Sequence, residues 1–174
     1  AVVTAAACWA AFLFAFSFET PPAPSVSLLL TVIVMAALAV VAESLAVEFT
    51  DKVTVTAANL PILLAMMFLG VWPAMAVAGI AGLWGCWRER SRFISVFNVA
   101  DYVLAALLGS GVFVALKALW GFSTDFVTPE LLLAGAVAAA TYEVTTLTSA
   151  GAAINMLYGR SLATYWKAEL PPFA

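Results

Sequence analysis

Residues 26–47 read VSLLLTVIVMAALAVVAESLAV, an apolar run in which Glu43 is the only charged side chain. A helix that crosses the hydrocarbon core of a bilayer needs about 20 consecutive, mostly apolar residues. The whole chain has this character, because 65% of its 174 residues are hydrophobic and only 10% are charged. Its mean hydropathy is +1.08. Since a soluble domain of this length cannot bury so much apolar surface, the sequence predicts an all-α integral membrane protein with one transmembrane domain over residues 1–174.

Other apolar segments flank this run on both sides. Prolines, glycines and charged clusters separate them, and such residues end or interrupt helices. Pro129 suits the first turn of the last helix. The alternation of polar and β-branched residues at 48–56 predicts a short extended segment at the membrane surface. The six predicted transmembrane helices cover approximately residues 2–18, 26–47, 57–69, 73–87, 96–120 and 129–158.

Basic residues indicate how the chain is oriented. Arg88, Arg90 and Arg92 form a basic loop after the fourth predicted helix, and Arg160 and Lys167 follow the sixth. Six spans place both groups on the same side of the membrane, which the positive-inside rule assigns to the cytoplasm. The sequence therefore predicts a multi-pass protein of the cell membrane with both termini in the cytoplasm.

Composition excludes several classes of function. The formal net charge of −3 gives no basic surface for nucleic acid. The chain has no histidine, which is the commonest metal ligand and the usual general base near neutral pH. Cys8 and Cys86 stand alone in apolar segments, without the paired spacing of a zinc or iron–sulfur site. We therefore expect no metal, no cofactor and no enzymatic activity.

Glu143 is the most informative polar residue, because it lies about halfway along the last predicted helix. Ionisable groups inside a membrane are costly and often functional. Thr146 lies three residues further on, so both occupy one partly polar face. The functional interpretation is a proton-linked site or a ligand-binding site formed by Tyr142, Glu143 and Thr146. The structural interpretation is a hydrogen bond from Glu143 to a hydroxyl or backbone carbonyl, and the residues favour neither. Aromatic and methionine side chains suited to an apolar pocket are Met66, Met67, Phe68, Trp84 and Tyr142.

Three further polar residues favour structural roles. Asp101 lies one turn into the fifth predicted helix, where the helix dipole favours a carboxylate. Together with Asn98 it could cap or brace the start of that helix. Glu43, near the cytoplasmic end of the second helix, is expected to pair with an arginine of the basic loop. These three residues are interpreted as intramembrane polar groups that support the fold.

The fourth predicted helix carries a stripe of small residues, Ala74, Ala78, Gly82 and Cys86, at four-residue spacing. Small residues on one helix face allow another backbone to approach closely. We expect this stripe to serve packing within the protein and not a dimer interface.

One longer stretch carries a family resemblance. Residues 59–79 read NLPILLAMMFLGVWPAMAVAG. This pattern resembles the substrate-binding S components of energy-coupling-factor vitamin transporters. It also resembles the membrane domains that precede HD-GYP, GGDEF or histidine-kinase modules in bacterial signalling proteins. The basic loop followed by Phe97-Asn98, and Gly159-Arg160-Ser161-Leu162 with Trp166, are similar to elements of the second group.

The resemblance extends over roughly residues 36–168 and implies an S-component-like bundle of six helices. Its first functional implication is a non-enzymatic sensory input domain that binds a small or lipidic ligand and passes a change in helix packing to a signalling module. The alternative is an S component that docks onto an energising module. A third possibility, independent of the resemblance, is an accessory structural subunit of a larger membrane complex.

Overall fold

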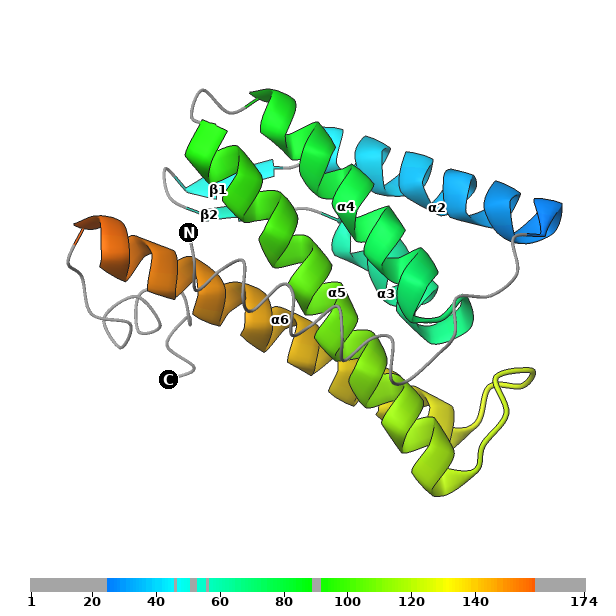
Figure 1. The fold of residues 1–174 in the computed structure, drawn as a ribbon. Coiled ribbons are helices and arrows are strands. Elements are labelled where there is room, and N and C mark those ends of the chain that lie inside the picture. Colours follow the sequence, from blue (N-terminus) through cyan, green and yellow to red (C-terminus); the bar gives the residue numbers. More distant parts are fainter. Residues whose placement is uncertain (1–24, 46, 51–52, 56, 89–91, 159–174) are drawn as a thin grey trace.

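The computed structural model describes residues 25–45, 47–50, 53–55, 57–88 and 92–158. Within these ranges the chain forms five helices and one β-hairpin (Figure 1). The predicted helix over residues 2–18 lies outside the described residues. The elements are α2 (Val26–Ser44), β1 (Val47–Thr50), β2 (Val53–Val55), α3 (Asn59–Phe68), α4 (Val71–Arg88), α5 (Arg92–Trp120) and α6 (Pro129–Tyr158).

Side-chain caps fix where two of the long helices begin. The Ser25 hydroxyl accepts a hydrogen bond from the backbone N–H of Leu28 at 3.1 Å, which caps α2. The Thr128 hydroxyl accepts from the N–H of Leu131 at 3.2 Å, and Pro129 is the first residue of α6, as predicted. Both hydroxyls satisfy N–H groups that have no partner within the helix.

Two glycines end α3 and α5. Gly70, in the turn between α3 and α4, has a φ of 92°, and Gly121, directly after α5, has a φ of 66°. Side chains disfavour this left-handed conformation, so glycine is suited to both turns. The Gly121 N–H donates to the carbonyl oxygen of Lys117 at 2.9 Å, which satisfies one of the last carbonyl groups of α5.

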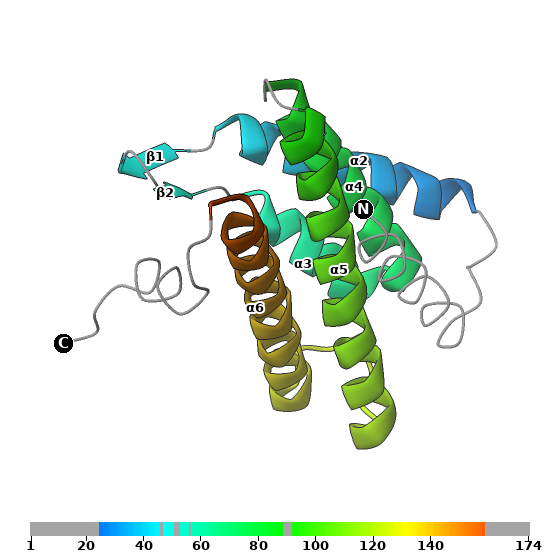
Figure 2. The ribbon, with the colours of Figure 1, turned by 60° about the vertical axis from the view of Figure 1, so that its left-hand side comes forward.

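The four long helices α2, α4, α5 and α6 pack side by side, and the short helix α3 contacts all of them. α4 lies between α2 and α5, and α5 lies between α4 and α6 (Figure 1). The antiparallel hairpin β1–β2 projects beside the end of α2 and the start of α3 (Figure 2), which confirms the predicted extended segment.

Alanines make up much of the core, together with larger side chains such as Phe113 and Tyr142, and many large apolar residues face outward. Ala74 and Ala78 of the small-residue stripe are fully buried. A Cβ on Gly82 would lie 3.0 Å from the Cα of Val99 on α5, so these two helices approach closely. The prediction that the stripe serves internal packing is confirmed for these residues. Exposed large apolar side chains include Leu29, Leu30, Ile33, Val34, Leu38 and Val41 of α2, and Leu132, Leu133 and Val144 of α6.

Three helices in the described part of the chain are long and apolar enough to cross a membrane: Val26–Ser44, Val96–Trp120 within α5, and Pro129–Ala153 within α6. The ten residues of α3 rise only about 15 Å, roughly half of a hydrocarbon core. The apolar part of α4, Val71–Gly85, is also short. Six complete spans are therefore not supported, because Gly70 ends α3 before it reaches spanning length.

Candidate functional site

A hydrogen-bonded group joins α3 to α6. Asn59, the first residue of α3, donates from Nδ2 to Oε1 of Glu143 at 2.8 Å. The hydroxyl of Tyr142 donates to Oδ1 of the same Asn59 at 3.5 Å. One amide therefore serves two neighbouring residues of α6 and fixes the start of α3 against the middle of that helix.

A second polar contact joins α5 to α6. The Ser149 hydroxyl is hydrogen-bonded to the Asp101 carboxylate and also lies 2.9 Å from the carbonyl oxygen of Thr145. Because α5 begins at Arg92, Asp101 lies well inside the helix, and the predicted cap by Asp101 and Asn98 at the helix start is wrong. Asp101 instead bonds across to α6.

A third contact joins α2 to α4. The indole Nε1 of Trp84 donates to the Ser44 hydroxyl at 2.8 Å, and this hydroxyl donates to the carbonyl oxygen of Val40 at 2.8 Å. Beside it, Oε1 of Glu43 lies 3.6 Å from where a Cβ on Gly85 would sit. The predicted pairing of Glu43 with the basic loop lies outside the described side chains: Arg88 ends α4, Arg92 begins α5, and Arg90 is not described.

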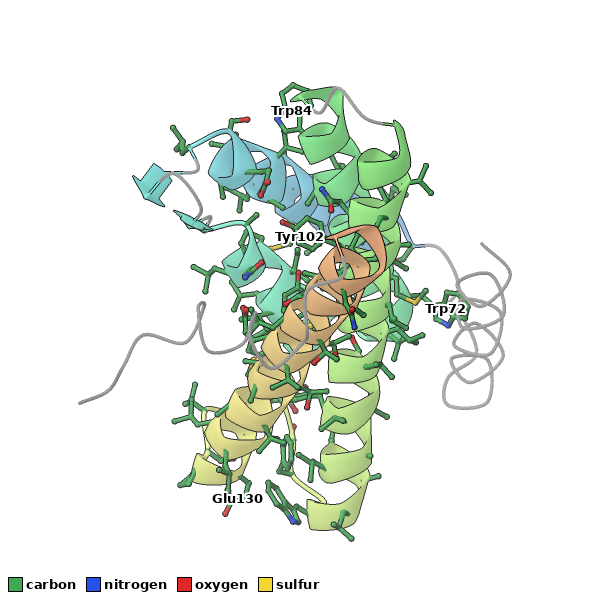
Figure 3. The ribbon with its side chains drawn as sticks, turned by 90° about the vertical axis from the view of Figure 1, so that its left-hand side faces the viewer. Trp72, Trp84, Tyr102 and Glu130 are labelled. Carbon is green, nitrogen blue, oxygen red and sulfur yellow. The ribbon has the colours of Figure 1, made fainter. Side chains whose placement is uncertain are left out.

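The three contacts surround two tyrosines. Tyr102 of α5 packs against α4, where a Cβ on Gly82 would lie 3.1 Å from its ring carbon Cδ2. In Figure 3, Tyr102 lies between Trp84 near one end of the bundle and Glu130 at the other. We call this set the polar layer, formed by Glu43, Asn59, Asp101, Tyr102, Tyr142 and Glu143.

The predicted ligand-binding residues have structural contacts in this arrangement. Tyr142 is fully buried. The Thr146 hydroxyl donates to the backbone carbonyl oxygen of Glu143 at 2.9 Å, not to its carboxylate. Glu143 itself is exposed apart from the bond to Asn59. Within the described ranges, no three His, Cys, Asp or Glu side chains lie close enough together to hold a metal ion.

A cavity of about 540 Å³ lies where α3 and α5 end. This volume falls in the range of small-molecule binding sites, about 300–1,000 Å³. Three groups of residues line it: Met66, Met67, Phe68, Leu69 and Gly70 at the end of α3; Phe113, Val114, Lys117 and Ala118 on α5; and Gly121, Phe122 and Thr124 in the following loop. The two glycine turns therefore place both helix ends at one site.

An aromatic contact forms part of the cavity wall. The rings of Phe113 and Phe122 meet edge to face, with centroids 5.9 Å apart and an interplanar angle of 76°. Trp120 lies 6.5 Å from Phe122 between ring centroids. Edge-to-face pairs are a preferred aromatic geometry, so the loop after α5 is anchored over the cavity by Phe122.

Two methionines of α3 fill spaces that glycines leave open. A Cβ on Gly109 of α5 would collide with Cε of Met66, and a Cβ on Gly135 of α6 would lie 2.7 Å from Cε of Met67. The end of α3 is thus held between α5 and α6 by flexible side chains that also line the cavity.

Sequence reasoning identified part of the cavity. Met66, Met67 and Phe68 line it, as predicted, whereas Trp84 and Tyr142 do not. Lys117 also lines the cavity, and the sequence did not assign it to a site. The turn glycines Gly70 and Gly121 were the signal that could have located the site, because each marks a helix end.

Comparisons with protein-family models, with curated proteins and with solved structures give no match to this chain.

Proposed function

We propose that this chain is a non-enzymatic, membrane-embedded ligand-binding domain of the sensory type. The cavity at the ends of α3 and α5 supports this function, because its volume and its wall of methionine and phenylalanine side chains suit a small apolar molecule. The binding site moves accordingly from Tyr142, Glu143 and Thr146 to this cavity. The polar layer becomes the part of the domain that responds to binding.

Helix α3 supplies a route between the two sites. Its first residue, Asn59, bonds to Glu143, and its last turn lines the cavity with Met66 and Met67. Because α3 is one short helix, a ligand that shifts its last turn, and not only the flexible methionine side chains, would also move Asn59. Such coupling needs two helix arrangements with different affinity for the ligand.

The transport alternative receives less support. An S component would need exposed small-residue faces to dock onto its energising module, yet Ala74 and Ala78 are fully buried within the bundle. The small-residue stripe therefore has its packing partner inside this chain.

A tryptophan in the cavity should abolish ligand retention. Ala118 lines the cavity, whereas its neighbour Leu119 is 76% exposed and does not. Native mass spectrometry of protein purified in mild detergent is expected to show a retained small molecule in the wild type and in Leu119→Trp, but not in Ala118→Trp. Equal retention in both variants would place the ligand elsewhere. Co-purifying protein chains without any small molecule would favour the structural-subunit alternative.

The proposal includes a membrane orientation in which the turn after α5 faces away from the cytoplasm and both termini lie in the cytoplasm. Single cysteines at Ser123 and Ser91, in a background without Cys8 and Cys86, should therefore react with an impermeant maleimide from opposite sides of the membrane. Equal reactivity from one side would contradict this topology.

A further inference from the structure

The cavity joins an apolar wall to one cationic group. Among the described residues that line it, Lys117 is the only charged one. Phe113 and Val114 lie one turn before Lys117 on the same face of α5, since residues spaced by three, four and seven share a helix face. The cavity therefore offers an ammonium group above a hydrophobic surface.

The acid in the loop after α5, Asp125, is hydrogen-bonded within that loop and does not line the cavity. Asp125 accepts a hydrogen bond from the Ser123 hydroxyl at 2.6 Å, and its own N–H donates to that hydroxyl at 3.1 Å. This local turn holds the Asp125 carboxylate within the loop. The lining of the cavity contains no carboxylate.

A second polar group lies on the same face of α5. Ser110 precedes Phe113 by three residues and Lys117 by seven, which places it one turn further in. Its hydroxyl is buried and is the one buried side-chain oxygen among the described residues without a hydrogen-bond partner. Buried polar groups are normally paired, but Ser110 does not line the cavity, so its hydroxyl is not assigned to a bound molecule.

We infer that the cavity binds an amphiphilic acid, with its apolar body against the methionine and phenylalanine wall and its anionic group paired with Lys117. This inference rests on the proposed function and names its ligand class. A charge-assisted bond to an ammonium group is stronger than a neutral one, and it would fix the orientation of the bound molecule. A free fatty acid and an anionic phospholipid share this chemistry.

Lys117 also has a structural role, and the test must separate this role from ligand binding. It lies in the last turn of α5, where a positive charge interacts favourably with the helix C-terminus. Lys117→Arg keeps the charge in both roles, whereas Lys117→Met removes it from both. Thermal stability measured after the retained small molecule has been removed therefore reports the structural role alone.

The experiment is photolabelling of the full chain in phosphatidylcholine vesicles with a diazirine-bearing fatty acid and with the fatty alcohol of equal length. Labelled peptides are mapped by mass spectrometry. Unlabelled fatty acid, unlabelled alcohol and vesicles that contain phosphatidylglycerol serve as competitors. Glu130→Gln, a charge change at the exposed start of α6, controls for the general surface charge near the cavity.

The acid is expected to label the cavity residues of α3 and α5, with labelling about tenfold weaker in Lys117→Met and unchanged in Lys117→Arg and Glu130→Gln. Competition by free acid alone identifies a free amphiphile as the ligand, and competition by phosphatidylglycerol identifies a lipid headgroup. Equal labelling by acid and alcohol, insensitive to Lys117→Met, overturns the ligand class but leaves the binding domain standing. Absence of cavity labelling by either probe overturns the ligand class, and it overturns the binding domain as well if Ala118→Trp retains the same small molecules as the wild type.

Discussion

Replacing Gly109 with valine is expected to lower the free energy of unfolding by about 3 kcal/mol, the upper end of the usual cost of overpacking a core. Even a Cβ at this position would lie 3.0 Å from the carbonyl oxygen of Ala138, which belongs to the backbone of α6 and cannot rotate away. It would also collide with the end of the Met66 side chain. The helices α5 and α6 must therefore separate to admit the new side chain.

Gly135→Ala is the matched control. There the added Cβ would meet only atoms of the flexible Met67 side chain, at 2.7 Å and beyond. Fluorescence-detected size-exclusion chromatography after heating should give a melting temperature about 10 °C lower for Gly109→Val and a much smaller shift for Gly135→Ala. Adding Met66→Ala to Gly109→Val should restore little, because the backbone collision persists. A Gly109→Val protein as stable as the wild type would show that the helices are not this close.

Asn59→Leu is expected to lower the free energy of unfolding by about 1 kcal/mol, because it removes the amide donor of the Glu143 carboxylate, a side chain that is exposed apart from this bond. Leaving a polar group unpaired costs more than removing both partners. The double variant Asn59→Leu with Glu143→Leu should therefore regain most of the lost stability. Thermal unfolding of the four proteins forms a double-mutant cycle that measures the interaction energy of this pair.

Two conservative variants sharpen this test. Glu143→Gln keeps an oxygen that accepts from Asn59 and removes the charge, so its stability should equal or exceed that of the wild type. Tyr142→Phe removes only the 3.5 Å bond to Asn59 and should cost about 0.5 kcal/mol at most. If Asn59→Leu were no more destabilising than Tyr142→Phe, the hydrogen bond between Asn59 and Glu143 would not contribute to stability.

The start of α6 could be predicted from local chemistry, whereas the start of α5 and the end of α2 differ from the prediction by three or four residues. Pro129 begins α6 as expected, since its fixed φ suits the first turn. α5 begins at Arg92 instead of residue 96, because arginine is a good helix former and the following residues are apolar. α2 ends at Ser44 instead of residue 47, because β-branched Val47 belongs to the hairpin.

The candidate site was harder to predict, because long-range contacts determine it. Asn59 and Glu143 are separated by 84 residues in sequence, and no local pattern pairs them. The predicted partner of Glu143 was a hydroxyl or carbonyl, whereas the structure provides an amide. The cavity depends on the turns at Gly70 and Gly121 meeting in space, which only the arrangement of α3 against α5 decides.

In the proposed membrane location, the short length of α3 has a consequence for the surrounding lipid. α5, with its 29 residues, rises about 44 Å, whereas α3 rises about 15 Å. Hydrophobic mismatch of this kind is accommodated by tilting the longer helix and by thinning the bilayer beside the shorter one. The membrane around this protein should therefore be uneven, with a depression on the side of α3 and the hairpin. The length of the lipid acyl chains sets the thickness of the bilayer beside α3. It can therefore act on the helix that carries Asn59 and the cavity methionines.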